Sequence, residues 1–264
     1  MKFKIPDALF GKSLEDCHKD YLEDLKRKGT KPPPPNPTLK GDFSLEDLAD
    51  FWTIHGISYR NEIYTVDLQK ILLDNGSSKT QQQWSEFSKQ AIQNNGFYVG
   101  NYPLYHSLFS SLYKNEGNQT HKDKIEEIRQ FLKDKFFNHW LTTLTRIIYT
   151  TSGKDKVIHN YGLNDQYETK EDIIGPSELV KTASNKAPYK ALLGTDDIDE
   201  INNIYKRITE KDAYLWRINK KPKKKEDERV AGFGADSLRA GLGCSRDPGG
   251  SYPALGVRVA KFLK

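Results

Sequence analysis

Residues 230–258 read VAGFGADSLRAGLGCSRDPGGSYPALGVR, and their composition differs from that of the rest of the chain. This segment holds seven of the nineteen glycines, yet it contains no Lys, Glu, Gln, Met, Trp, Asn, Ile, Thr or His. The remaining chain is rich in Lys, Glu, Asn and Ile. A shift this local indicates a requirement that applies to this segment alone, and we expect that requirement to be its function.

Two short strands are expected within this segment, and a third, mostly apolar strand follows them at Leu255–Ala260. Because successive side chains of a strand point to opposite faces, Phe233 and Leu242 are expected on one face and the neighbouring glycines on the other. Glycine is destabilising inside strands, so the glycine-bearing face is not optimised for folding. The residues expected to form the inward-facing scaffold are Phe233, Leu242, Cys244, Leu255 and Val257.

The missing amino acids match a specific pattern of mutation. If either adenine of an Asn codon AAC becomes any base, the reachable amino acids include Gly, Asp, Ser, Leu, Arg, Tyr, Cys, Ala and Pro. Lys, Glu, Gln, Met and Trp are unreachable, and all five are absent from residues 230–258. The composition therefore favours a surface that is varied by mutation of adenines. An ordinary pair of glycine-rich hairpins is the alternative interpretation.

The chain before residue 141 is expected to be mainly helical. Apolar residues recur at helical spacing, and capping residues such as Ser13 and Ser44 precede several of these stripes. Residues 31–37 contain five prolines, which forbid a helix and predict an extended linker. The expected helices are Ser13–Gly29, Ser44–Trp52, Asp67–Asp74, Gln81–Asn94, Tyr102–Lys114 and Lys122–Trp140.

After residue 140 the pattern changes to β-branched and aromatic runs separated by turn residues. Two helices interrupt these runs, at Ala187–Leu193 and Asp197–Ile208. The fold class is therefore α+β, with a mainly helical region 1–140 and a second region 141–264. The expected strands are Leu144–Thr151, Lys156–His159, Tyr167–Ile174, Ala213–Ile218, Glu228–Phe233, Gly241–Ser245 and Pro253–Phe262.

Composition and charge favour a soluble globular protein. The net charge is only +5 with 41 basic and 36 acidic residues, which predicts solubility more than nucleic-acid binding. The dense basic run Lys220–Lys225 is followed directly by Glu226–Glu228, a pattern typical of a solvated hairpin loop. No run approaches the ~18 apolar residues of a membrane-spanning helix, and the N-terminus lacks the apolar core of a secretory signal. We therefore expect no membrane span, and the localisation is unknown, with the cytoplasm as the default.

No motif in the chain specifies an enzyme, a metal site or a cofactor. The six histidines show neither HxH nor HExxH spacing, and Gly232-Phe233-Gly234 lacks the helix that a dinucleotide loop requires. Cys17 and Cys244 are far apart and form no CxxC pair. Cys244 has no histidine near it in sequence, so a small buried residue is favoured over a nucleophile. We expect a non-enzymatic protein without a cofactor.

Phe233-x-Ala235 through Asp247-Pro248, followed by Ala254–Lys261, resembles the variable region of a diversity-generating retroelement target protein. The segment is similar in particular to the archaeal variable proteins, and the similarity covers about the last 35 residues of the chain. Those proteins end in a C-type lectin fold of the formylglycine-generating-enzyme type, with a terminal GFRV-like strand. Gly256-Val257-Arg258-Val259 stands in that place here. The Trp-Asn-Asn runs of the bacterial variable proteins are absent.

The resemblance implies a C-type lectin-like domain at 141–264, with a variable region at about 230–258 that binds an unknown ligand. We expect that ligand to be a protein, held by a rigid framework with adaptable surface residues as in an antibody. Arg246 and Tyr252 are the expected energetic anchors. The expected variable face consists of Gly232, Gly234, Asp236, Leu238, Arg239, Gly241, Gly243, Ser245, Arg246, Gly249, Gly250 and Tyr252.

Two other functions remain as alternatives. An enzyme related to the formylglycine-generating type requires a catalytic cysteine, for which Cys244 is the candidate. A nucleic-acid-binding protein would use Lys220–Lys225, and its affinity would fall steeply with salt. For a binding face, Gly232, Asp236, Arg239, Ser245 and Tyr252 must gather on one accessible patch.

Overall fold

The computed structural model describes residues 8–9, 12–13 and 42–261. The chain divides into two units, Met1–Pro35 and Asn36–Lys264. In the first unit, β1 (Ala8–Leu9) pairs antiparallel with β2 (Lys12–Ser13). The helix expected to follow Ser13 and the proline-rich linker 31–37 lie outside the described residues.

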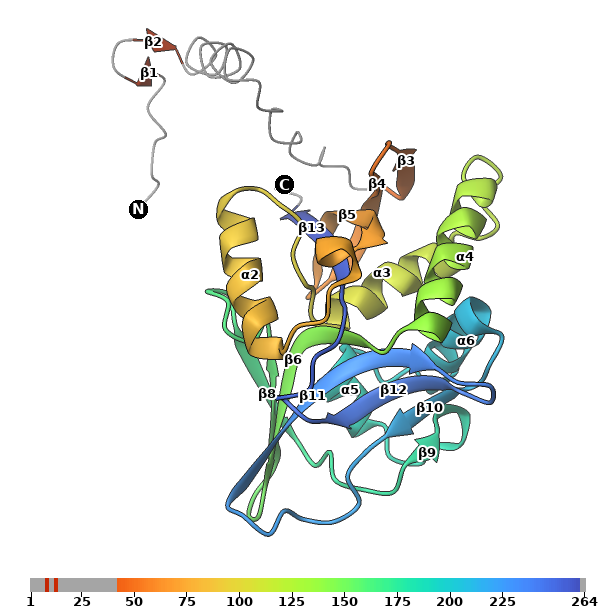
Figure 1. The fold of residues 1–264 in the computed structure, drawn as a ribbon. Helices are drawn as coiled ribbons and strands as arrows, with labels where there is room; N and C mark the ends of the chain where they lie inside the picture. The colour runs from red at the N-terminus through yellow and green to blue at the C-terminus, as the bar shows by residue number, and fades with distance from the viewer. Residues whose placement is uncertain (1–7, 10–11, 14–41, 262–264) are drawn as a thin grey trace. The chain divides into compact units, whose positions relative to one another are not determined.

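A seven-stranded sheet dominates the second unit (Figure 1). Its strand order is β8-β7-β6-β11-β12-β10-β9, and all neighbours are antiparallel except the parallel pair of β10 and β12. Each of the strands expected from the sequence between residues 141 and 246 is present. They are β6 (Leu141–Thr150), β7 (Asp155–His159), β8 (Tyr167–Glu171), β10 (Ala213–Trp216), β11 (Glu226–Ala235) and β12 (Ala240–Arg246). The sheet also contains β9 (Glu178–Leu179), which was not expected.

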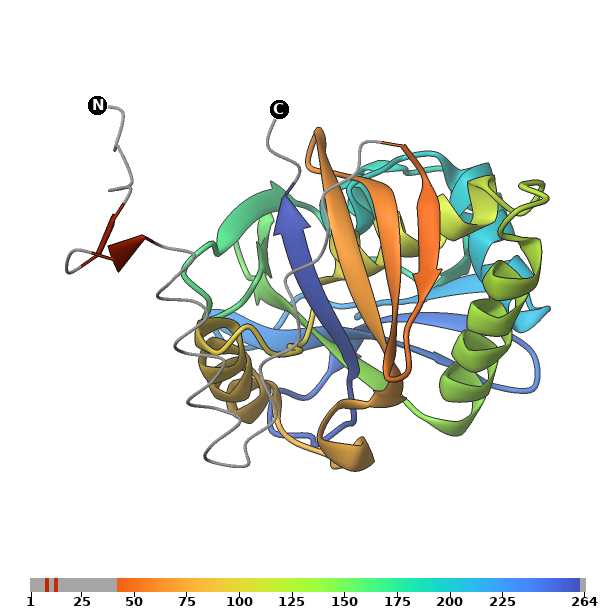
Figure 2. The same ribbon diagram turned by 90° about the horizontal axis from the view of Figure 1, so that it is seen from above.

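A second, four-stranded sheet has the order β13-β5-β4-β3. Its last strand comes from the end of the chain and lies beside a strand from residues 62–72, as Figure 2 shows. The hairpin between β4 and β5 turns at Arg60 and Asn61, whose φ angles of 52° and 61° are left-handed. The strands are β3 (Ser44–Asp47), β4 (Phe51–Tyr59), β5 (Glu62–Leu72) and β13 (Leu255–Lys261).

Within residues 42–261, five α-helices connect and cover the sheets. α3 packs against both β4 and β6, and it also contacts α5 and α6. Three helices begin with side-chain caps, because the side chains of Thr80, Asn101 and Asp197 accept backbone N–H groups of the first turn. Ser44, which was expected to cap a helix, lies in β3. The helices are α2 (Gln81–Gln93), α3 (Tyr102–Lys114), α4 (Lys122–Asn138), α5 (Ala187–Leu193) and α6 (Ile198–Thr209), with 3-10 turns η1 (Leu73–Gly76) and η2 (Val180–Thr182).

The α+β class is confirmed, but a mainly helical region before residue 141 is correct only in part. The helices expected at Ser44–Trp52 and Asp67–Asp74 are wrong, because these residues fall largely in β3, β4 and β5. At Ser44–Trp52 the chain forms a local hairpin, in which Ser44 pairs with His55. At Asp67–Asp74 the physical reason is non-local pairing. The buried carboxylate of Asp67 on β5 accepts hydrogen bonds of 2.6 and 2.9 Å from Arg258 on β13, almost two hundred residues away. A local capping pattern cannot reveal such a partner.

Phe233 on β11 is the centre of the main core. Its fully buried ring contacts aromatic rings on three helices, at centroid distances between 4.6 and 6.3 Å. The helices α3 and α4 therefore share one core with the strands that follow them. The contacting residues are Tyr102, Tyr105, Phe109, Phe136 and Tyr205.

Within the described residues, no helix combines the length and the apolar character that a membrane crossing requires.

His159 on β7 ties its strand to two other elements. Its Nε2 donates to the carbonyl oxygen of Ala191 at 2.9 Å, and its Nδ1 accepts from the hydroxyl of Thr145 at 3.0 Å. Burial lowers the pKa of His159 to about 4, so the ring is neutral in the folded protein at pH 7. In the unfolded chain the ring takes up a proton near its ordinary pKa of 6.5. The stability that depends on the neutral ring is therefore present above pH 6.5 and is lost as the pH falls toward 4.

We expect His159→Gln to weaken the loss of stability in acid. Glutamine keeps an N–H donor for Ala191 but does not titrate, so the variant should lose roughly 2 kcal/mol less than the natural protein between about pH 7 and about pH 4.5. Urea denaturation at a series of pH values measures this difference. Equal losses in the two proteins would contradict a neutral buried histidine.

Candidate binding surface

The strands β11 and β12 place four glycines directly opposite one another. Gly232 pairs with Gly243, and Gly234 pairs with Gly241. The alternating side chains point into the core as expected: Phe233, Leu242 and Cys244 are fully buried in the main cluster, together with Leu255 and Val257 of β13. The scaffold predicted from the sequence is therefore confirmed.

The four glycines do not form an exposed variable face, and this expectation is wrong. All four are buried, because side chains from elsewhere lie across them. The indole of Trp140 covers Gly234 and Gly241, and the guanidinium of Arg246 covers Gly232. A Cβ atom at Gly232 would also clash with the carbonyl oxygen of Leu141. The glycines thus have a packing role, which is to leave room for Trp140 and Arg246.

Arg246 is a half-buried cation without a carboxylate partner among residues 42–261. Its guanidinium donates to the carbonyl oxygens of Leu141 at 2.6 Å and Phe233 at 2.8 Å. It also stacks between the rings of Trp140 and Tyr252, at 5.1 and 5.0 Å from their centroids. Burial lowers the pKa of Arg246 to about 10, which leaves the group charged at neutral pH.

A second arginine stacks on aromatic rings of the neighbouring strand. The guanidinium of Arg239 lies 4.0 Å from the ring centroid of Tyr214 and 5.5 Å from that of Trp216. These two rings, on β10, are themselves 4.7 Å apart. Arg239, like Arg246, has no carboxylate within ion-pair distance in the described part of the chain.

A shallow pocket of about 360 Å³ lies beside Arg246, and its lining includes Trp216, which Arg239 contacts. Trp140, Trp216, Arg246 and Tyr252 line it, together with Ser245 and the backbone of Gly243. Trp140 covers two glycines, but 43 % of its own surface is exposed. Its ring therefore forms one side of the open pocket. We call the surface formed by the following residues the aromatic–arginine surface: Trp140, Tyr214, Trp216, Arg239, Arg246 and Tyr252.

The remaining residues of the expected variable face sit in turns at either end of β12. Asp236 accepts hydrogen bonds from the backbone N–H groups of Leu238 and Arg239, both at 2.8 Å. Asp247 accepts from the backbone N–H of Gly249 at 2.7 Å. Asp236 and Gly249 therefore shape their turns, whereas Leu238 projects from its turn with 72 % of its surface exposed.

The predicted patch is therefore only partly assembled. Arg239, Ser245, Arg246 and Tyr252 reach a common surface, Asp236 is exposed at its edge, and Gly232 is buried. Three aromatic residues of this surface lie outside residues 230–258 and were not expected there from the sequence. For Tyr214 and Trp216 on β10 the sequence does carry a signal. They alternate with Ala213 and Leu215, which predicts that the two aromatic side chains share one face of the strand. The missed residues are Trp140, Tyr214 and Trp216.

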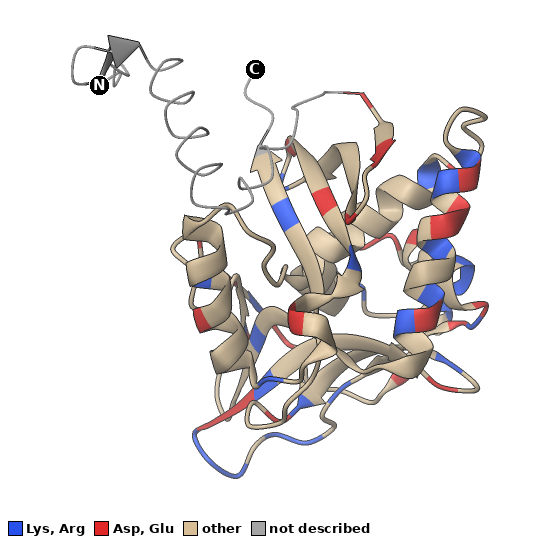
Figure 3. Ribbon diagram, turned by 45° about the horizontal axis from the view of Figure 1, so that its top comes forward, with Lys and Arg blue, Asp and Glu red and all other residues tan. Residues whose placement is uncertain are grey.

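Few groups near this surface could take part in catalysis. The thiol of Cys244 is fully buried, and burial raises its pKa to about 12, so it stays protonated at neutral pH. Residues 42–261 and the two short strands before them contain no cluster of His, Cys, Asp and Glu that could hold a metal ion. Charged residues are concentrated in α4, in the loop between β10 and β11 and at the start of β11 (Figure 3).

The paired glycines Gly232 and Gly243 provide a matched test of this packing. An added Cβ at Gly232 would clash with backbone and with Arg246, whereas at Gly243 its nearest contacts lie at 3.4 and 3.5 Å. We expect Gly232→Ala to destabilise the fold by about 1–3 kcal/mol and Gly243→Ala by less than about 1 kcal/mol. Urea denaturation measures both. Equal tolerance at the two positions would show that Gly232 is free to vary.

No family model matches the sequence, and no curated protein or solved structure matches the chain. The chemistry of the aromatic–arginine surface is thus defined by the contacts within this chain. Those contacts involve four large aromatic side chains and two cations without acidic partners in the described residues. Among these side chains, Trp140 and Arg246 lie over the buried glycines of β11 and β12.

Proposed function

We propose that this chain is a non-enzymatic ligand-binding protein and that the aromatic–arginine surface is its binding face. The observation that carries the proposal is the stacking of Arg239 and Arg246 on four exposed or half-exposed aromatic rings. Trp, Tyr and Arg are the residues that dominate binding energy in protein interfaces, because they combine large area with directed polar groups. A protein ligand fits a surface of this composition.

The polar groups of the surface call for an acidic ligand. Arg246 is a desolvated positive charge whose hydrogen bonds within the described chain all go to carbonyl oxygens. The indole N–H of Trp216 is buried and has no acceptor among the described residues. Unpaired buried donors cost free energy, and a carboxylate in the pocket would supply both a counter-charge and an acceptor. The ligand segment is therefore expected to place Asp or Glu beside a flat apolar group.

Diversification by a retroelement would act on the side chains that reach this surface. The candidates are Leu238, Arg239, Ser245, Arg246 and Tyr252, all of which can arise from an Asn codon by adenine mutation. Gly232 is excluded, because backbone atoms leave no space for a Cβ. A C-type lectin-like fold is part of the same proposal. It is supported by the position of the Gly256–Val259 motif within the terminal strand β13.

The two alternatives have less support. An enzyme that uses Cys244 would need an accessible thiolate, and this thiol is buried and protonated. For nucleic acid, the run Lys220–Lys225 lies in the loop before β11, and the acidic residues at the start of β11 follow it directly (Figure 3). An affinity for single-stranded DNA that falls steeply with salt would favour this alternative.

Selection of displayed peptides tests the binding face. A random peptide library selected on the full-length protein should yield sequences with Asp or Glu next to an aromatic residue. The double variant with Arg246→Gln and Tyr252→Ala should lower the affinity of these peptides at least about a hundredfold, because each anchor contributes roughly 2 kcal/mol or more. Affinities are measured by calorimetry.

Two control variants accompany this experiment. Arg229→Gln removes an arginine that pairs with Asp227 outside the surface, and Cys244→Ala removes the thiol. Both should leave the affinity unchanged. Peptides without acidic residues, or binding that survives the double variant, would reject this surface as the binding face.

The origin of the variation is tested in the DNA downstream of the gene. We expect a near-copy of the codons for residues 230–258 that differs from the gene only where the copy has adenine, beside a reverse-transcriptase gene. The codons of Arg246 and Tyr252 should align with adenine-containing codons, and the codon of Gly232 should be identical in both copies. Sequencing of the flanking DNA reads this directly. If no such copy exists, the retroelement origin is wrong, although the binding face can still be correct.

A further inference from the structure

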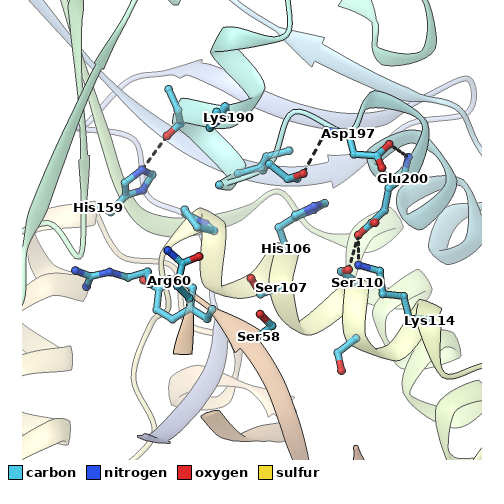
Figure 4. Close-up of a pocket in the computed structure, with 18 of the residues that line it drawn as sticks. Ser58, Arg60, His106, Ser107, Ser110, Lys114, His159, Lys190, Asp197 and Glu200 are labelled. Atoms are coloured by element: carbon cyan, nitrogen blue, oxygen red, sulfur yellow. Dashed lines mark hydrogen bonds and ion pairs between the residues drawn. The ribbon is translucent and has the colours of Figure 1, made fainter. Parts of the chain in front are cut away.

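A second cavity, of about 530 Å³, opens where the β4–β5 hairpin meets α3 and the segment joining α5 to α6 (Figure 4). None of the six residues of the aromatic–arginine surface lines it. Its volume lies within the range of roughly 300–1,000 Å³ that is common for small-molecule sites. It is therefore a separate candidate for a ligand much smaller than a protein.

One wall of this cavity carries a buried nitrogen without a partner. His106 on α3 is only 3 % exposed and stacks on Tyr205, whose hydroxyl lies 3.4 Å from its Nδ1. Its Nε2 has no hydrogen-bond partner among the described residues. Such a group costs about 1–3 kcal/mol when it is left unsatisfied. Burial lowers the pKa of His106 to about 4, so the ring is neutral and can either donate or accept at Nε2.

Hydroxyl groups without partners line the same space. Ser107 lies next to His106 on α3, and Ser58 on β4 lies near Ser107, as Figure 4 shows. Neither side chain has a hydrogen bond within the described part of the chain. A serine hydroxyl both donates and accepts, so this part of the wall matches the hydroxyl groups of a ligand.

The acidic groups of the cavity are already engaged by neighbouring residues. Glu200 accepts a hydrogen bond of 2.5 Å from Ser110 and lies 2.9 Å from the Nζ atom of Lys114. Asp197 caps α6 by accepting the backbone N–H of Glu200 at 2.9 Å. These contacts compensate the negative charges at one end of the cavity.

The opposite end of the cavity in Figure 4 carries an uncompensated cation, Arg60. Its guanidinium lies 4.1 Å over the ring of Tyr167 and has no carboxylate within ion-pair distance in residues 42–261. A guanidinium stacked on a ring keeps its in-plane N–H groups free for a bidentate anion. Arg60 also holds a left-handed φ of 52°, which is uncommon for a residue of this type and fixes it at the tip of the hairpin.

We propose that this cavity binds a small hydroxylated organic anion, of the sugar-acid or sugar-phosphate class. The anionic group is held by Arg60, and the hydroxyl groups face Ser58, Ser107 and His106. The site is independent of the binding face on the large sheet, so either assignment can fail without the other.

Calorimetric titration of the full-length chain tests the proposal with four probes: glucuronate, glucose 6-phosphate, glucose and inorganic phosphate. We expect at least one of the two hydroxylated anions to bind about tenfold or more tightly than glucose and than inorganic phosphate. Phosphate binding as tight as that of glucose 6-phosphate would identify a general anion site and overturn the proposal. Glucose binding as tight as that of glucuronate would overturn the role of the anion, and no binding of either anion would overturn the site.

Three variants separate the contributions of the side chains. Arg60→Gln, at an exposed turn, should weaken the anion at least about tenfold, since charged hydrogen bonds contribute roughly 1.5–3 kcal/mol. Ser107→Ala should weaken it about three- to tenfold. Arg229→Gln on β11, outside the cavity, should have no effect. Anion binding that is unchanged in Arg60→Gln, with the fold verified by circular dichroism, would contradict the assignment.

Discussion

The close approach of backbone and side chain over the paired glycines of β11 and β12 is the constraint on which this structure depends. Because Gly234 and Gly241 lack a Cβ atom, the indole of Trp140 lies flat on the sheet. On the other face of the same strands, Phe233 fills the centre of the aromatic core. The hairpin thus separates the aromatic core from the Trp140 side of the sheet by a single layer of backbone.

Arg246 connects this layer to the neighbouring strand. The ladders of β11 change register between Val230 and Gly232, toward both β6 and β12. At this irregularity the guanidinium donates to the carbonyl oxygens of Leu141 and Phe233. An arginine that satisfies backbone groups in this way is fixed in orientation and still presents its charge to the pocket. Such preorganisation lowers the entropy that a ligand would have to overcome on binding.

The sequence predicted the elements whose signals are local and missed what depends on distant residues. Strand alternation correctly placed Phe233 and Leu242 in the core, and the helix expected at Asp197–Ile208 is present as α6. Asp67–Leu72 of β5 appeared helical because their partner β13 is far away in the chain, whereas Ser44–Trp52 carry a capping pattern but form a local hairpin of β3 and β4. The burial of the glycines was equally hidden, since Trp140 lies outside the segment that carries them. Alternation gives the direction of a side chain, but not what covers it.

The glycine-rich composition of residues 230–258 therefore has more than one cause. Some glycines of the segment are required by packing, as at Gly232, where backbone atoms exclude any side chain. Ser245 and Tyr252, in contrast, reach a pocket where many side chains could be accommodated. A segment under both demands would combine fixed small residues in its strands with variable residues at its surface-facing ends. Rigid backbone beneath changeable side chains is the arrangement that lets a surface vary without loss of the fold, because the energetic cost of each change stays outside the core.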